Sequence, residues 1–87
     1  MDRQRIDKWL WHARVVRTRG DAAALAGAGH VRLNGRRVAG PSQPVRIGDV
    51  VTVALDRAVR VVEVRGFCER RGAAPLARGL YREIRAP

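Results

Sequence analysis

The apolar residues near the start of the chain recur with the spacing of one helical face. Four of them stand at i, i+3, i+4 and i+7: Ile6, Trp9, Leu10 and Ala13. This spacing predicts an amphipathic helix whose apolar stripe faces a core. Asp2 is the expected N-cap, and we expect Val15-Val16 to end the helix against the core.

A second helix is predicted directly after the first. Thr18 has the side chain of an N-cap, and Asp21 stands in the first turn, where the helix dipole favours a carboxylate. Residues 22–28 are small and helix-prone, so this helix can pack closely. Gly29 is placed to end the helix, because glycine readily adopts the left-handed conformation that follows many helices.

The next segment alternates as a half-buried strand and then turns. Val31 and Leu33 alternate with polar neighbours. Asn34-Gly35 is the strongest hairpin signal in the chain, because both residues tolerate the positive φ of a type I′ turn. Residues 36–38 start the returning strand. Residues 40–44 predict a loop, whose two prolines exclude regular ladder pairing.

The second half of the chain predicts another hairpin. Residues 45–49 read as a short extended piece and a turn. Residues 50–55 and 58–65 are apolar and β-branched, and they flank Asp56-Arg57, so they predict two paired strands. Val61-Val62 breaks the strict alternation, which leaves the register there undetermined.

The last part of the chain is less regular. Residues 66–72 are irregular and basic, and residues 74–84 predict a final helix. Pro75 suits only the first turn of that helix, and Gly79 weakens it. With no internal repeat, residues 1–87 are expected to form a single α/β (α+β) domain.

Composition changes the picture through its charge. The chain of 87 residues has 18 Lys and Arg against 8 Asp and Glu, a net charge of +10. Lys8 is the only lysine. A GC-rich genome explains the use of arginine but not the charge excess. Arginine matches phosphate bidentately and stacks on bases, which favours a nucleic acid over an anionic membrane surface or an acidic protein partner.

The same composition excludes several other functions. Cys68 is the only cysteine, so no internal disulfide or cysteine-based zinc site is expected, and no cofactor is implied. No nucleophile–base pair, paired carboxylates or phosphate-binding glycine loop appears, so we expect no catalysis. The chain has no apolar run long enough for a signal peptide or a membrane span, which predicts a cytoplasmic protein.

Cations gather around the two predicted helices. Arg5, Lys8 and His12 share a face of the first helix away from its apolar stripe, with Arg14 close by. A merely solvated face would interleave glutamates, and none is present here. Arg17-Thr18-Arg19 opposes the dipole of the second helix, which favours a bound phosphate there.

Several of these side chains have alternative roles. Asp7 is an expected partner for one arginine near the second helix. Trp9 belongs to the apolar stripe, whereas Trp11 lies off it and either packs, the favoured role, or stacks on a base. His12 and His30 have no metal-ligand partners in the sequence and are expected to be surface or RNA-facing residues, not catalytic groups.

The hairpin adds cations beside the second helix, and the candidate RNA-binding residues can then be named together. They are Arg5, Lys8, His12, Arg14, Arg17, Thr18, Arg19, Arg32, Asn34, Arg36 and Arg37. No metal-binding or catalytic residue is expected among them.

Several of these motifs stand in the order and spacing of a known domain. They are Arg5-Ile6-Asp7-Lys8-Trp9-Leu10, Arg14, Thr18-Arg19, Gly29-His30-Val31, Leu33-Asn34-Gly35 and Val45-x-x-Gly48-Asp49-x-Val51. Over residues 5–52 the chain resembles the alpha-L RNA-binding domain first seen in ribosomal protein S4, and residues 53–87 follow as a strand and C-terminal extension. Leu10-Trp11, Cys68-Glu69-Arg70-Arg71 and Leu80-Tyr81 further resemble the stand-alone fifteen-kilodalton ribosome-associated heat shock protein family.

The resemblance implies two short helices packed on a small twisted, mostly antiparallel sheet, with Arg5, Arg14, Arg17 and Arg19 facing RNA. It also implies binding to rRNA or tRNA of the large ribosomal subunit, especially a subunit left with peptidyl-tRNA. Gram-positive relatives assist the C-terminal tailing of stalled chains in ribosome quality control. This chain lacks the long basic C-terminal extension of some heat-shock members, which favours the compact quality-control relatives.

The prediction is therefore a non-catalytic, monomeric, cytoplasmic RNA-binding factor of the large subunit, active in the stress response. Two alternatives stay open: an RNA-targeting subunit or fragment for an RNA-modifying enzyme, and an integral ribosomal protein. DNA binding is a weaker option, because no groove-filling helix with base-reading Asn or Gln is found.

Overall fold

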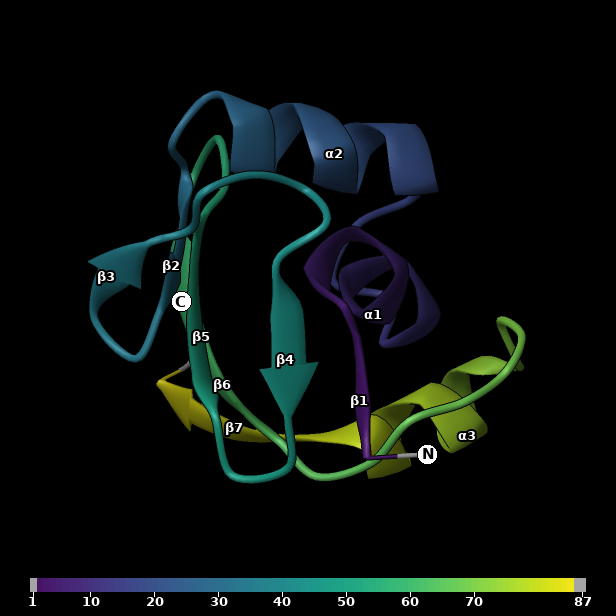
Figure 1. Ribbon diagram of the computed structural model, residues 1–87. Coiled ribbons are helices and arrows are strands. Elements are labelled where there is room, and N and C mark those ends of the chain that lie inside the picture. Colours follow the sequence, from purple (N-terminus) through teal and green to yellow (C-terminus); the bar gives the residue numbers. More distant parts are fainter. Residues whose placement is uncertain (1, 86–87) are drawn as a thin grey trace.

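A five-stranded antiparallel sheet with two short helices on one of its faces forms the main body of the molecule (Figure 1). The computed structural model describes residues 2–85. The helices are α1 (Ile6–His12) and α2 (Arg19–Gly27). The sheet has the order β3-β2-β5-β6-β7, with β2 Val31–Leu33, β3 Arg36–Arg37, β5 Val50–Ala54, β6 Val59–Val64 and β7 Tyr81–Arg85.

The apolar stripe of α1 faces the core, as its spacing predicts. Ile6, Trp9 and Leu10 are fully buried, against inward-facing valines of the sheet: Val31, Val51, Val53, Val62 and Val64. The expectation that Asp2 caps this helix is wrong. The residue at the N-cap is Arg5, without a side-chain cap, because the chain reaches α1 from a strand, β1 (Arg3–Arg5).

The second helix begins and ends close to the predicted residues. The Thr18 hydroxyl accepts a hydrogen bond of 3.0 Å from the backbone N–H of Asp21, which confirms Thr18 as the N-cap. Gly29 follows the C-cap with φ +85°. Substitution there is unfavourable because L side chains rarely adopt this φ, whereas the nearest atoms to an added Cβ belong to the flexible end of the Arg37 side chain, which can move away.

Both predicted hairpins form. Asn34 and Gly35 have φ values of 52° and 85°, the two positive values of a type I′ turn, and they connect β2 to β3. β5 pairs antiparallel with β6 along its whole length, from Val50 opposite Glu63 to Ala54 opposite Val59. The ladder between β6 and β7 shifts register between Val61 and Val62, where the alternation of the sequence breaks.

One proline stands inside a strand, contrary to the expected loop. β4 (Pro44–Arg46) pairs with β1, and Pro44 lies opposite Arg5 in this separate two-stranded ribbon. Pro44 is the first residue of its strand, where the missing N–H is tolerated. The ribbon positions α1, because the N–H of Ile6 donates to the carbonyl of Gln43 at 2.8 Å.

The last element is a strand where a helix was expected. Helix α3 covers only Ala74–Ala77 and continues as a single 3-10 turn, η1 (Arg78–Leu80). The chain then pairs with the open edge of β6 as β7. Gly79 favours an end to the helix, and pairing with β6 satisfies the backbone groups that follow. The predicted fold class, an α+β domain with a short C-terminal helical segment, is confirmed.

Candidate RNA interface

The buried carboxylate of Asp7 brings together cations from two elements. Arg5 donates to the two carboxylate oxygens from Nε at 3.1 Å and from Nη2 at 3.0 Å. Nε of Arg19, in the first turn of α2, lies 3.7 Å from Oδ2. The backbone N–H of Lys8 donates to Oδ1 at 2.7 Å. Asp7 is thus the arginine partner that the sequence indicated, and it joins the start of α1 to the start of α2.

His12 lies beneath this face instead of on it. The side chain is 1% exposed, which corrects its expected surface position, and its ring lies 5.2 Å from the ring of Trp11. Burial lowers the pKa of His12, and the nearby charges of Lys8, Arg19 and Arg71 lower it further, against a hydrogen bond to the Cys68 backbone. The imidazole is therefore neutral at pH 7. It cannot contact RNA directly in this conformation.

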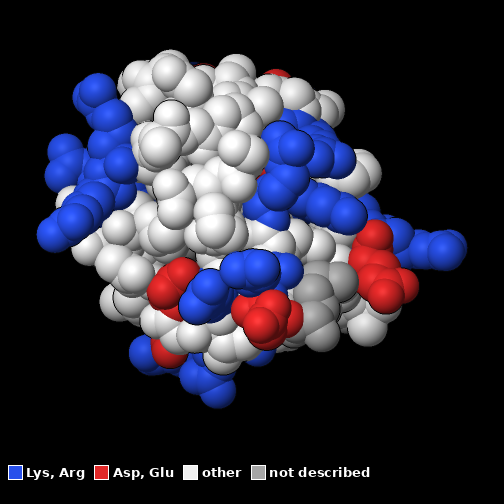
Figure 2. All heavy atoms as spheres, in the orientation of Figure 1, with Lys and Arg blue, Asp and Glu red and all other residues white. Residues whose placement is uncertain are grey.

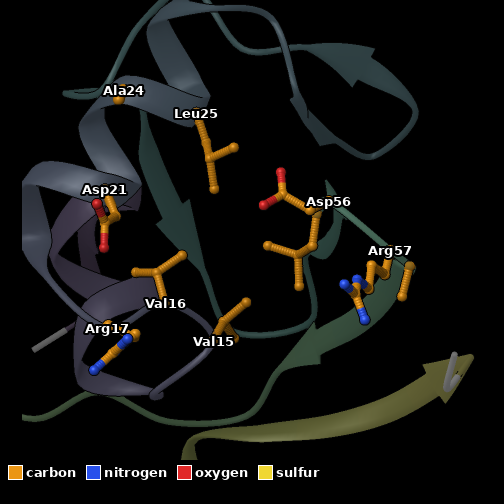
Figure 3. Close-up of a pocket in the computed structure, with 10 residues that line it drawn as sticks. Val15, Val16, Arg17, Asp21, Ala24, Leu25, Asp56 and Arg57 are labelled. Carbon is orange, nitrogen blue, oxygen red and sulfur yellow. The ribbon is translucent and has the colours of Figure 1, made fainter.

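Arg14 and Arg17 lie in the connection between the helices. Arg14 is exposed, has φ 59°, and donates from Nε at 3.1 Å and Nη2 at 3.0 Å to the carbonyl of Gly72. Arg17 is exposed and lies at the edge of a cavity of about 680 Å³. Figure 3 shows the apolar side chains of Val15, Val16 and Leu25 around that cavity, with Arg17 on one side of it. The two arginines extend the cationic surface on either side of the inter-helix turn.

The hairpin cations form a separate group. Arg32, Arg36 and Arg37 are exposed on β2 and β3. In Figure 2 the blue spheres at the position of β3 are divided by uncharged surface from those near α1. Asn34 has a structural role in this hairpin. Its Nδ2 donates to Asp49 at 3.1 Å, and its Oδ1 accepts from the N–H of Val50 at 2.8 Å.

One cation near α1 was missed by the sequence interpretation. Arg71 donates from Nε to the carbonyl of Trp11 at 3.1 Å, and its guanidinium lies 6.0 Å from the centre of the Trp11 ring. Trp11 is half-buried and packs against the core, the role favoured from the sequence. The sequence signals for Arg71 were the basic character of residues 66–72 and its place in Cys68-Glu69-Arg70-Arg71, and neither assigns it a contact. Its contact with α1 spans 60 positions of the chain.

Within residues 2–85, no three His, Cys, Asp or Glu side chains are grouped so that they could hold a metal ion. None of the helices in that range has the length and apolar character needed to cross a membrane.

A cationic helical face above a small antiparallel sheet defines a compact RNA-binding module. The model of the S4 domain matches residues 4–51. The structure of heat shock protein 15 from Vibrio cholerae, described as trimeric, superposes with a TM-score of 0.87 at 36% identity, covering 94% of this chain and 82% of that one. The chain therefore belongs to the S4 domain family of RNA-binding proteins and, within it, to the heat shock protein 15 group.

Curated relatives agree with this assignment. A heat shock protein 15 homolog of Aeromonas salmonicida is 40% identical over 94% of this chain and 61% of its own length. Heat shock protein 15 of Escherichia coli K12 is 38% identical over 91% of this chain and 59% of its own length. The chain thus spans about three fifths of these relatives. Small ribosomal subunit protein uS4 of Rhodopseudomonas palustris is 36% identical over 77% of this chain and 34% of its own length.

Proposed function

We propose that this protein is a non-catalytic factor that binds rRNA or tRNA of the large ribosomal subunit, in the rescue or quality control of subunits stalled with peptidyl-tRNA. The observation that carries the proposal is the gathering of Arg5 and Arg19 around Asp7 at the start of both helices. One carboxylate faces two guanidinium groups there, so the pair keeps an excess of positive charge. An RNA phosphate is the natural counterion for such a face.

The start of α2 supports a phosphate site in particular. The N-terminus of a helix carries partial positive charge, and Arg17 and Arg19 flank the Thr18 cap. Cations at that position oppose the dipole, so they contribute little to stability alone. Recognition would depend mainly on shape, because A-form grooves hide base edges from side chains. We expect the hairpin cations Arg36 and Arg37 to reach a second stretch of the same RNA.

The test is sedimentation of the protein with purified large subunits as salt is raised. If about four phosphates are neutralised, log affinity should fall against log salt with a slope of about −3 to −4. Arg19→Glu should abolish sedimentation with the subunits. Arg82→Glu, on the outer face of the sheet, makes the same charge change and should leave most of the binding. A slope near zero, or equal loss in both variants, would contradict the proposal.

Other outcomes separate the alternatives. Stoichiometric retention on salt-washed subunits would indicate an integral ribosomal protein. The similarity to uS4 is consistent with this alternative. Binding to free tRNA without subunits would indicate an RNA-targeting partner of a modifying enzyme. We further propose a cytoplasmic protein that binds as a monomer. Because the Vibrio cholerae relative is described as trimeric, a trimer mass in light scattering would overturn the monomer.

A further inference from the structure

The segment of residues 66–73 crosses α1 outside the part of the chain that matches the S4 domain. In Figure 1 the green chain between β6 and α3 runs beside β1 and α1. Side chains from β1, from α1 and from the turn after α1 hold its backbone at three points. Trp9 Nε1 donates to the carbonyl of Gly66 at 3.0 Å, and Gln4 Nε2 donates to that of Cys68 at 2.8 Å. Arg14 holds Gly72.

One side chain of the segment reaches in the opposite direction. Arg71 donates through Nε to the carbonyl of Trp11 and places its guanidinium against the Trp11 ring. Within the described residues, the Nη atoms of Arg71 make no hydrogen bond or ion pair. The group is therefore fixed at one nitrogen and by the indole, while its remaining donors stay available.

Arg71 lies next to the cationic side chains of α1 and adds a further positive charge to them. Its charge acts on the buried His12 together with those of Lys8 and Arg19, so all three lie around the same imidazole. Arg70 is exposed directly beside it. A planar guanidinium held against an indole is suited to stack on a nucleobase, because Arg stacks on aromatic faces where Lys cannot.

We propose that Arg71, held on Trp11, binds an unpaired nucleobase of the RNA, next to a phosphate contacted by Arg70. This inference rests on the proposed function and adds to it the kind of RNA element that is bound: a helix with a base turned out of its stack. The helical face alone recognises the backbone of a duplex. Arg71 would add a preference for a helix carrying a bulge.

The experiment uses two labelled RNA hairpins that differ by one unpaired adenosine. The wild-type protein should bind the bulged hairpin about tenfold more tightly, the size expected for one stacked base. Arg71→Lys keeps the charge and a donor for the Trp11 carbonyl but removes the planar guanidinium group. That variant should bind both hairpins equally, with little change for the paired one. Arg82→Lys is the matched control and should keep the tenfold ratio.

Two results would overturn the inference. Equal binding of both hairpins by the wild-type protein would exclude a base site. A tenfold ratio that survives in Arg71→Lys would leave Arg71 only its role in fixing the 66–73 segment. Equal thermal unfolding of Arg71→Lys and wild type would exclude loss of that fixing as the cause of a lost ratio.

The test is independent of the one for the ribosome. Arg19→Glu should weaken binding of both hairpins by the same factor and leave their ratio unchanged. If large subunits fail to bind while the hairpin ratio depends on Arg71, the proposed ribosomal function is wrong and the base site stands. If subunits bind but the ratio is absent, only the base site is wrong.

Discussion

The helical face and the outer face of the sheet both carry arginines, yet they differ in how many carboxylates lie among those arginines. On the sheet, glutamates of β6 and β7 lie opposite arginines, and the pairs are Arg60–Glu83 at 2.6 Å, Arg82–Glu63 at 2.9 Å and Arg65–Glu63 at 3.8 Å. On the helical face, the pairs of Arg5 and Arg19 share the single carboxylate of Asp7. Two glutamates thus pair with three arginines on the sheet, whereas Asp7 is the single carboxylate paired with arginines on the helical face, which also carries Lys8, Arg14 and Arg17.

This difference indicates which arginines stabilise the fold and which remain for a ligand. The hydrogen bond to Glu83 raises the pKa of Arg60, as expected for a cation that is satisfied within the protein. Cross-strand pairs of this kind contribute modestly to a sheet. Asp7 is different, since it is 3% exposed and holds side chains of two elements. It organises the cationic face without neutralising it.

The largest effect on this comparison is expected from Asp7→Ala. The substitution removes the acceptor of the Lys8 N–H and leaves Arg5 and Arg19 without their shared carboxylate. Hydrogen bonds to charged groups contribute about 1.5–3 kcal/mol, so we expect the free energy of unfolding to fall by about 2 kcal/mol. Glu83→Ala, on the half-exposed sheet face, should cost about 1 kcal/mol or less. Urea denaturation measures both, and equal losses would show that the two faces use their carboxylates alike.

A smaller effect separates the same faces in RNA binding. Arg5→Ala removes a cation of the helical face that is 51% exposed, and Arg82→Ala removes one of the sheet that is 61% exposed. We expect affinity for a structured RNA to fall about tenfold in the first variant and less than twofold in the second, since in the proposed function only the first cation meets phosphate. The salt slope should also become shallower by about one in Arg5→Ala alone. Filter binding at several salt concentrations gives both quantities, and a parallel response of the two variants would remove the distinction.

The β2–β3 hairpin is a third region whose stability and RNA binding can be compared with those of the helical face and the outer face of the sheet. Asn34→Ala removes the side-chain bonds to Asp49 and Val50 and places alanine at φ 52°. The expected cost is about 1–2 kcal/mol, the usual penalty for an ordinary residue in the left-handed region. RNA affinity, measured where the variant is fully folded, should change less than twofold. A tenfold loss of affinity would instead make Asn34 a direct RNA contact, as its place among the candidate residues allows.

Local chemistry decides which parts of the fold were predictable. The stripe of α1, the Thr18 cap and the Asn34-Gly35 turn depend on neighbours within a few residues, and all three were predicted correctly. The errors concern pairing over long distances. Asp2 does not cap α1 because β1 pairs with β4 about 40 positions later, and residues 81–84 form a strand because β6 offers an open edge. Neither partner can be read from the local sequence.

The candidate site divides in the same way. Arg5, Arg19 and their partner Asp7 were found because they stand near predicted helix ends. His12 was misplaced, because helical spacing puts it off the apolar stripe, while the later 66–73 segment, bonded to its ring at Cys68, covers it. Arg71 was missed for the same reason. Its contact with Trp11 exists only because the folded chain places the 66–73 segment against α1.

The smallest expected effect concerns pH and belongs to the helical side alone. Burial lowers the pKa of His12 below the ordinary value of 6.5 that it regains on unfolding. Between those two values the unfolded chain binds the proton more strongly than the folded one, so the free energy of unfolding must increase with pH. The stabilising effect of neutral His12 is complete above about pH 6.5 and is lost as pH falls through the lowered folded value.

Thermal unfolding between pH 5.5 and 7.5 therefore sharpens the comparison, because carboxylates titrate mostly below this range. The wild-type melting temperature should fall toward pH 5.5, and His12→Gln should flatten that dependence by removing the titrating group. His30→Gln is the matched control, since it makes the same change at the other histidine, which is exposed. RNA phosphates on the cationic face should reduce the fall as well, because they offset the charges of Lys8 and Arg19 that oppose protonation of His12. Parallel curves for wild type and His12→Gln would show that protonation of His12 does not change the stability in this pH range.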